Sequence, residues 1–145
     1  MRLTLQTYSI TTVTYGRRSL FQRKANAELM VNILLRYRDQ ARYSLHAFVV
    51  IPDHVHAILS PSDASSLERC VQCIKGGFSF AVRGQFSGEV WQSGYHEHRV
   101  RDYDDYQHQI AYIAANPERR GLIDYPYVHS SWPVLIDPMP EHLRG

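Results

Sequence analysis

The chain has 145 residues, of which 44% are hydrophobic and 21% are charged, and this composition excludes a disordered or a fibrous protein. The net charge is only +2 but is unevenly distributed, because residues 1–50 carry eight basic and two acidic side chains whereas residues 51–145 carry eight basic and twelve acidic ones. A basic half of this kind suits contact with a polyanion. The length is normal for one folding unit, and we expect a single domain over residues 1–145.

The sequence contains no apolar run long enough to cross a bilayer, and its N-terminus alternates polar and apolar residues where a signal peptide would be continuously apolar. We therefore expect a soluble cytoplasmic protein with no membrane partner. Cys70 and Cys73 lie in a helical pattern without a second pair of Cys or His ligands nearby. Two reduced, partly buried thiols are expected there rather than a zinc site or a disulfide.

The first elements along the chain are a strand and a helix. Residues 7–14 are rich in β-branched and aromatic side chains and are followed by Gly16, which predicts a strand that ends in a turn. Residues 23–41 place apolar side chains at helical spacing with no Gly or Pro among them. This pattern predicts the first helix.

A hairpin and a second helix follow. Residues 44–51 and 54–60 both predict strands, and the Pro-Asp pair at 52–53 between them predicts a tight turn. The second helix is expected to begin at Ser65 or Ser66. Its apolar stripe consists of Leu67, Val71, Ile74, Phe78 and Val82. Two adjacent glycines at 76–77 weaken the helical pattern locally.

Residues 89–100 predict a last strand or a bulged ribbon, in which Gly94 marks a bend. Asp102 is a suitable N-cap for a helix over residues 103–116. From about Tyr125 onward we expect an irregular tail, because this segment contains Pro126, Pro133, Pro138 and Pro140.

The predicted order of elements is therefore βαββαβα. A single antiparallel sheet with helices mainly on one face satisfies this order with short connections. We expect an α+β fold of ferredoxin-like type.

His54 and His56 form a candidate metal-binding pair. Side chains at positions i and i+2 of a strand leave the same face, so the two imidazoles are expected to project side by side while Val55 points to the opposite face. Two surface histidines near a hairpin turn give the same pattern by chance. The pair alone therefore does not establish a metal site.

The predicted last helix carries a second candidate group. A rotation of about 100° per residue places Tyr106, Ile110 and Ile113 on its packing side. The opposite side carries Asp105, His108, Tyr112 and Asn116. Tyr112 and Asn116 are one turn apart and can face one ligand, and a Tyr oxygen can attack phosphorus when a divalent cation polarises the phosphate. Alternatively, Tyr112 is an ordinary amphipathic residue and Asn116 ends the helix before Pro117.

Three segments resemble, in order and spacing, a known family. They are Ile51–His56 (IPDHVH), Trp91–Asp102 (WQSGYHEHRVRD) and Tyr112–Leu122 (YIAANPERRGL). The chain is similar over residues 7–133 to the REP-associated tyrosine transposases, which are relatives of the single-tyrosine HUH transposases of bacterial insertion sequences.

The resemblance implies that His54 and His56 hold Mg²⁺ or Mn²⁺, that Asn116 completes the metal site, and that Tyr112 is the nucleophile. Related transposases often have Gln at the position of Asn116. The implied reaction is cleavage of single-stranded DNA at hairpin-forming repetitive extragenic palindromes, with a 5′-phosphotyrosine intermediate and a released 3′-hydroxyl. The resemblance also implies a nucleoid-associated bacterial protein that acts as a monomer or a homodimer.

Further residues are candidates for DNA contact. Arg17 and Arg18 can hold phosphates, although they can equally be part of a solvated turn. His96 and His98 form a second His-x-His pair. The charged Glu97 between them fits a buried sheet face poorly, so contact with DNA or a supporting role is favoured over a metal site. The remaining candidates that can line a DNA path are Arg99, Arg101, Arg119 and Arg120, which can instead pair with acidic side chains.

Three aromatic residues, Tyr95, Trp91 and Trp132, can stack on unpaired bases. At least one of the tryptophans is expected to belong to the core.

The sequence leaves two alternatives to a DNA-cutting enzyme. The first is a protein that binds hairpin DNA without cutting it, which the intact set of His54, His56, Tyr112 and Asn116 disfavours. The second is a metal-dependent phosphoesterase for small molecules that uses water as the nucleophile. Such an enzyme needs neither the tyrosine nor the basic N-terminal half.

Overall fold

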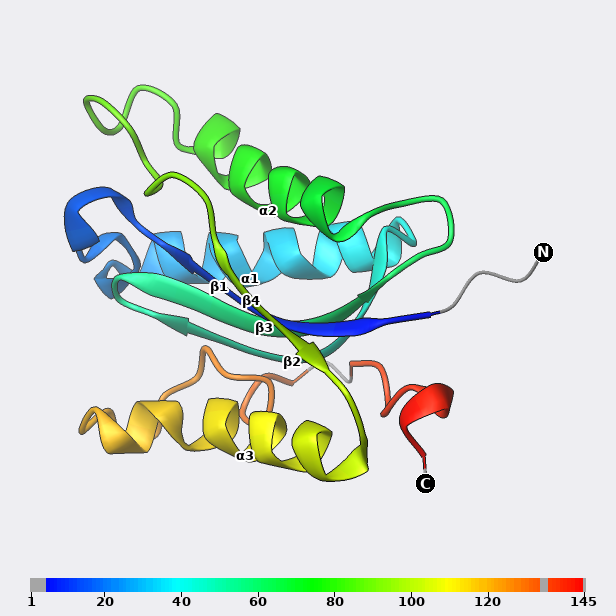
Figure 1. The fold of residues 1–145 in the computed structure, drawn as a ribbon. Helices are drawn as coiled ribbons and strands as arrows, with labels where there is room; N and C mark the ends of the chain where they lie inside the picture. Colours follow the sequence, from blue (N-terminus) through cyan, green and yellow to red (C-terminus); the bar gives the residue numbers. More distant parts are fainter. Residues whose placement is uncertain (1–4, 134–135, 145) are drawn as a thin grey trace.

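A computed structural model describes residues 5–133 and 136–144 of the chain. Its four-stranded antiparallel sheet has the strand order β2-β3-β1-β4 (Figure 1). The strands are β1 (Thr7–Val13), β2 (Tyr43–Ile51), β3 (His54–Pro61) and β4 (His96–Val100). The helices are α1 (Lys24–Asp39), α2 (Leu67–Ala81) and α3 (Tyr103–Arg119). The predicted α+β class and the order βαββαβα are confirmed.

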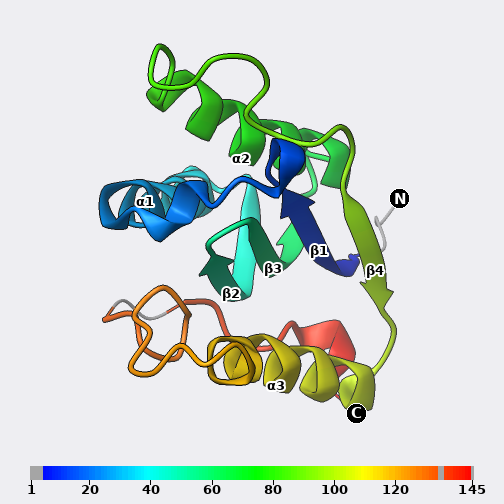
Figure 2. The ribbon, with the colours of Figure 1, turned by 90° about the vertical axis from the view of Figure 1, so that its left-hand side faces the viewer.

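The sheet has a helical layer on each face. Helices α1 and α2 cover one face, whereas α3 and the C-terminal segment cover the other (Figures 1 and 2). Strand alternation divides the side chains of β3 between two cores, since Val55 belongs to the core under α1 and α2 and Ile58 to the core under α3. The helices thus lie mainly on one face, as expected, and α3 is the exception. Within the described residues, no helix has the length and apolar character needed to span a membrane.

Helix α2 begins where the sequence predicts. The Ser66 hydroxyl accepts a hydrogen bond from the backbone N–H of Arg69 at 3.2 Å and so caps the helix. The helix continues through its two glycines because Gly77 packs directly against α1, where an added Cβ would lie 3.0 Å from the ring of Tyr37. Both cysteines of this helix are free, with Cys70 buried and Cys73 half-buried.

The predicted strand over residues 89–100 is wrong for its first part, since β4 begins only at His96. Gly94 has a φ of +76°, which turns the chain out of the extended conformation just before β4. Trp91 forms an isolated bridge with Thr14, and its indole N–H donates to the carbonyl of Lys75 at 3.0 Å. Trp91 is buried and is therefore the tryptophan that belongs to the core.

The predicted end of the last helix at Asn116 is also wrong, because α3 continues to Arg119 with Pro117 inside it. Proline has no backbone N–H, so the helix lacks one hydrogen bond at this position. Gly121, two residues beyond the end of the helix, has a φ of +73° and donates its N–H to the carbonyl of Glu118 at 2.9 Å. Glycine provides this left-handed termination without a steric penalty.

The tail that begins near Tyr125 is irregular, as predicted, apart from the short helix η3 (Glu141–Leu143). It runs along the outer edge of β2. The backbone N–H of Val50 donates to the carbonyl of Tyr127 at 2.8 Å, and the N–H of Asp137 donates to the carbonyl of Leu45 at 2.8 Å. The tail thereby covers part of an exposed strand edge, which would otherwise be open to pairing with another chain.

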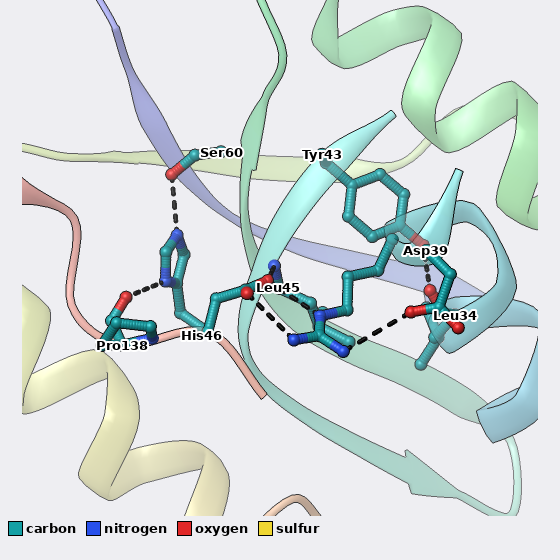
Figure 3. A network of polar contacts seen from close by, with 9 residues as sticks. Leu34, Asp39, Tyr43, Leu45, His46, Ser60 and Pro138 are labelled. Atoms are coloured by element: carbon teal, nitrogen blue, oxygen red, sulfur yellow. Dashed lines mark hydrogen bonds and ion pairs between the residues drawn. The ribbon is translucent and has the colours of Figure 1, made fainter. Parts of the chain in front are cut away.

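Polar contacts fasten this tail to α1 and β2 (Figure 3). The Arg38 guanidinium donates from Nε and Nη2 to the two carboxylate oxygens of Asp137, each at 3.0 Å, and one of these oxygens also accepts the N–H of Leu45 at 2.7 Å. Nearby, Nδ1 of His46 donates to the carbonyl of Pro138 at 2.7 Å. Burial lowers the pKa of His46, so its imidazole is neutral at pH 7.

Replacing Asp137 with alanine should lower the free energy of unfolding by about 2 kcal/mol, because it leaves both Arg38 and the N–H of Leu45 without their acceptor. Urea denaturation followed by circular dichroism measures this change. Asp63→Ala is the matched control, since Asp63 is exposed and its removal should leave the midpoint within error of wild type. Identical midpoints for Asp137→Ala and wild type would contradict the proposed anchoring of the tail.

Candidate active site

The candidate metal pair lies at the start of β3, on the sheet face that α3 covers. His54 and His56 are 7% and 9% exposed. They share this face with Ile58, whose side chain is in the core under α3, while Val55 lies on the opposite face. The sequence-based expectation that the two imidazoles leave the same face therefore agrees with the structure.

Each imidazole uses one nitrogen in a hydrogen bond within the protein. Nδ1 of His54 donates to Oδ1 of Asp53 at 2.7 Å, and Oδ2 of the same carboxylate accepts from Arg17 at 3.0 Å. Nε2 of His56 shares a hydrogen bond with the hydroxyl of Ser9 on β1 at 2.8 Å. These contacts fix both rings and leave Nε2 of His54 and Nδ1 of His56 for a ligand.

Burial keeps both histidines neutral. Desolvation lowers the pKa of His56 to about 4, and the neighbouring His54 lowers it further, because two imidazolium charges would repel each other. Desolvation also lowers the pKa of His54 and outweighs the opposing influence of Asp53. Burial would raise the pKa of Asp53, but the hydrogen bonds from His54 and Arg17 prevail and hold it below its usual value. Neutral imidazoles offer the lone pairs that a metal ion needs.

Tyr112 of α3 lies beside this pair. Its ring centroid is 5.8 Å from that of His56, with an edge-to-face angle of 62° between the rings. The following residue, Ile113, is fully buried and anchors the helix, whereas Tyr112 itself is 52% exposed. The guanidinium carbon of Arg119 lies 4.1 Å from the Tyr112 ring centroid, and the guanidinium also donates to the carbonyl of Tyr112 at 3.1 Å. The tyrosine is thus both held in place and open to solvent.

Asn116 is in a different environment from the one expected. The sequence places it with Tyr112 on the non-packing side of the helix, but its side chain is only 4% exposed. Asn116 is about 60° from Ile113 around the helix axis, so it lies at the margin of the packing stripe and faces the sheet. Asn116 is one turn beyond Tyr112, and around the helix axis both residues lie on the same side of Ile113. An amide in this position is suited to a ligand between helix and sheet.

Three of the candidate arginines gather near the histidine pair. Arg17 binds Asp53, and Arg119 lies on Tyr112. Arg120, at the end of α3, is close enough for its charge to lower the pKa of both Asp53 and His54. The neighbouring Arg18 turns away and donates to the carbonyls of Tyr15 and Glu89.

The remaining candidates do not join this group. His96 and His98 are on β4 and are exposed, separated from His56 by β1, where Thr11 pairs with both His56 and His96. His98 instead binds Asp105 in the first turn of α3 at 2.8 Å. Arg99 and Arg101 are exposed on and just beyond β4.

Tyr95 is half-buried and packs against the core under α1 and α2. Trp132 is likewise half-buried against this core. Neither residue lies in the group around His54 and His56.

Residues 3–116 match the family described as IS200-like transposases. The chain belongs to this family. Its members are DNA-processing enzymes, and the resemblance noted in the sequence is confirmed by a REP-associated tyrosine transposase of Escherichia coli (strain K12) that is 26% identical over 107 residues. That alignment covers 73% of this chain and 61% of the relative, so the chain matches less than two thirds of the relative's length.

Two solved structures have the same fold as this IS200-like transposase. One is a REP-associated tyrosine transposase bound to a REP hairpin, with a TM-score of 0.73 and 22% identity over 99% of this chain and 94% of that chain. The other is a putative transposase from Deinococcus radiodurans, with a TM-score of 0.58 and 21% identity over 78% of this chain and 92% of that chain.

Two residues that contact the histidine pair are absent from the sequence-based candidates. Asp53 stands directly before the first histidine, and an acidic residue next to a candidate metal-binding histidine is a signal that the sequence offers. Ser9 offers no such signal, because it is 47 residues from His56 in the chain and meets it only through the pairing of β1 with β3.

The donor set of the site is small. Within residues 5–133 and 136–144, no three His, Cys, Asp or Glu side chains are grouped to hold a metal ion. Two imidazole nitrogens and the amide oxygen of Asn116 fit a divalent ion that takes its other ligands from water or from phosphate oxygens. This donor set is unlike a closed structural zinc site, which has four protein ligands.

In the metal-free protein, the His56 imidazole should remain neutral on acidification to about pH 5, since burial lowers its pKa to about 4. A titration of the imidazole ¹⁵N resonances by NMR, assigned with a His56→Gln variant, measures this directly. Free histidine in the same buffer is the control, since its imidazole has the ordinary pKa of about 6.5. If the His56 resonances moved together with those of free histidine, the ring would not be buried as described.

Proposed function

We propose that the chain is a metal-dependent nuclease and strand transferase that cuts single-stranded DNA through a covalent tyrosine intermediate. The observation that carries this proposal is the position of Tyr112, whose exposed ring lies 5.8 Å from that of the buried, neutral His56. A nucleophile open to a long substrate, beside nitrogen ligands, is the arrangement that attack on a phosphodiester needs.

His54, His56 and Asn116 would hold the divalent ion. Nε2 of His54 and Nδ1 of His56 are the imidazole nitrogens not engaged by Asp53 and Ser9. When bound, Mg²⁺ or Mn²⁺ would polarise the scissile phosphate and stabilise the charge that develops on its oxygens. Asp53 would keep the His54 ring in the tautomer that presents Nε2 to the ion.

Tyr112 would then carry the reaction. Its phenol loses the proton to water, the oxygen forms a bond to phosphorus, and the bond from phosphorus to the 3′ oxygen breaks as that oxygen takes up a proton. The product is a 5′-phosphotyrosine and a free 3′-hydroxyl. Arg119, whose guanidinium lies on the Tyr112 ring, would direct its remaining N–H groups to the phosphate oxygens. The phosphotyrosine bond keeps the energy of the cleaved phosphodiester, so the same residues can rejoin the strands.

Hairpin-forming single-stranded DNA is the proposed substrate. The structure of a relative with a TM-score of 0.73 contains a REP hairpin. Arg17, Arg119 and Arg120 surround the site in this chain and suit a polyanion.

Tyr112→Phe should abolish the covalent product, because phenylalanine has the same ring without the attacking oxygen. The test incubates wild type and variant with end-labelled hairpin oligonucleotides and Mn²⁺ or Mg²⁺, then resolves protein-linked DNA on denaturing gels. The matched control is Tyr103→Phe at the far end of α3, which should cut like wild type. Equal yields of protein-linked DNA from wild type and Tyr112→Phe would exclude the tyrosine mechanism. If wild type bound the hairpins without cleaving them, the chain would be a hairpin-binding protein and not a nuclease.

Metal binding can be tested without the reaction. Asp53→Ala should weaken Mn²⁺ binding about 10- to 100-fold, because the His54 ring loses the partner that orients it. Asp53→Asn should have a smaller effect, since an amide oxygen still accepts from Nδ1. Isothermal titration calorimetry with metal-free protein measures both variants, with His56→Ala as the variant lacking a ligand and Asp63→Asn as the control. An Asp53→Ala variant that binds Mn²⁺ like wild type would rule out this role of Asp53.

A further inference from the structure

The sheet face that carries His54 and His56 is only partly covered by helix. Helix α3 packs chiefly on β2 and β3, and His96 at the start of β4 is exposed on the same face. Strand pairing aligns three side chains there in one row, because Thr11 of β1 is the cross-strand partner of both His56 and His96. The two imidazoles therefore flank a threonine and leave the same side of the sheet, with roughly 10 Å between their Cα atoms.

A hollow of about 180 Å³ lies beside the candidate metal pair. Its wall includes Thr11 and Val13, which are the cross-strand partners of the two histidines on β3. His96 and the preceding segment 92–95 complete the wall. The hollow thus continues the candidate site toward β4. Its volume is smaller than that of a typical ligand site and suits one part of a larger substrate.

The segment that leads into His96 is held in place. The Lys75 ammonium donates to the carbonyl of Gln92 at 3.1 Å and to that of Gly94 at 2.9 Å. Gly94 then turns the chain, and pairing with β1 begins at His96 itself. The imidazole of His96 is therefore presented from a fixed backbone.

Helix α3 turns the side that carries Tyr112 toward β4. His98 lies on the same face of β4 as His96 and contacts Asp105 of the helix at 2.8 Å. Asp105 and Tyr112 are seven residues apart and so lie on one side of the helix, two turns from each other. Because β4 and α3 run in opposite directions, the step from His98 back to His96 leads toward Tyr112 (Figure 1).

We propose that His96 is the general acid that protonates the 3′ oxygen as it leaves phosphorus. The proposal rests on the function proposed above and names the proton donor of that reaction. A phosphate over Thr11 lies between Tyr112 on one side and His96 on the other. Displacement at phosphorus needs the attacking and leaving oxygens roughly in line, on opposite sides. Imidazole is the side chain that enzymes use most often for proton transfer.

The proposed step conserves protons and electron pairs. The Tyr112 oxygen forms its bond to phosphorus, the bond from phosphorus to the 3′ oxygen breaks, and the imidazolium of His96 gives its proton to that oxygen. The neutral imidazole that remains can accept the proton of a 3′-hydroxyl when the strands are rejoined. One residue thereby serves both directions of the reaction.

The test compares two hairpin oligonucleotides that differ only in the bridging atom at the bond that wild type cuts, with oxygen or sulfur at the 3′ position. A thiolate leaves without a proton, because a thiol is far more acidic than an alcohol. In single-turnover cleavage with Mn²⁺, His96→Gln should cut the oxygen substrate about 10²- to 10⁴-fold more slowly than wild type. It should cut the sulfur substrate at close to the wild-type rate.

The matched control is His142→Gln, which also replaces an exposed histidine. His142 lies on η3 beside Thr7, at the end of β1 that is remote from the candidate metal pair. This variant should cut both substrates like wild type. His96→Gln should also bind Mn²⁺ like wild type in isothermal titration calorimetry, whereas weaker binding would make His96 a metal ligand and overturn the inference.

Loss of cleavage on the oxygen substrate, with recovery on the sulfur substrate, would support the inference. A wild-type rate of His96→Gln on the oxygen substrate would overturn it, and so would an equal loss on both substrates, which indicates a residue that only contacts DNA. In both cases the proposed function stands if wild type forms DNA linked to Tyr112. If wild type cuts no hairpin, the proposed function fails, and the inference fails with it.

Discussion

The packing of α3 on the sheet is the contact on which the candidate site depends. Ile113 has no exposed surface and lies in one core with Ile58 of β3 and Val100 of β4. Tyr112 precedes Ile113, so the depth at which Ile113 is buried sets the height of the tyrosine above His56. Because packed cores admit few alternative arrangements, Tyr112 and the histidine pair are held in one relative position.

The same contact supplies the electrostatic character of the site. A sheet face covered by a helix is poorly solvated, and the histidines on it are consequently neutral. A buried polar group is costly unless it is hydrogen-bonded, and Asp53 and Ser9 satisfy one nitrogen of each ring. These hydrogen bonds offset part of the free-energy cost of burying the two imidazoles, and one nitrogen of each ring remains for a ligand.

The C-terminal segment has a structural role in this layer. Val128 and Leu143 belong to the core under α3, so part of the apolar surface that holds the helix comes from the tail. The ion pair between Arg38 and Asp137 fastens the tail to α1, which lies on the other face of the sheet. Helix α3 is thus supported by contacts that reach both layers, and the region around Tyr112 and Arg119 stays exposed to solvent.

Local sequence patterns were sufficient to predict much of the fold and part of the candidate site. The alternation of β3 determines that His54 and His56 share a face, and the helical period of residues 103–116 identifies Ile113 as a packing residue, since both depend only on the geometry of one element. Tertiary structure decided that α3 crosses to the histidine face, that Asn116 is buried, and that residues 89–95 lie outside strand β4. It also brought Ser9 to His56 and Arg120 near His54, because contacts between distant segments depend on the packing of the whole chain and not on any local period.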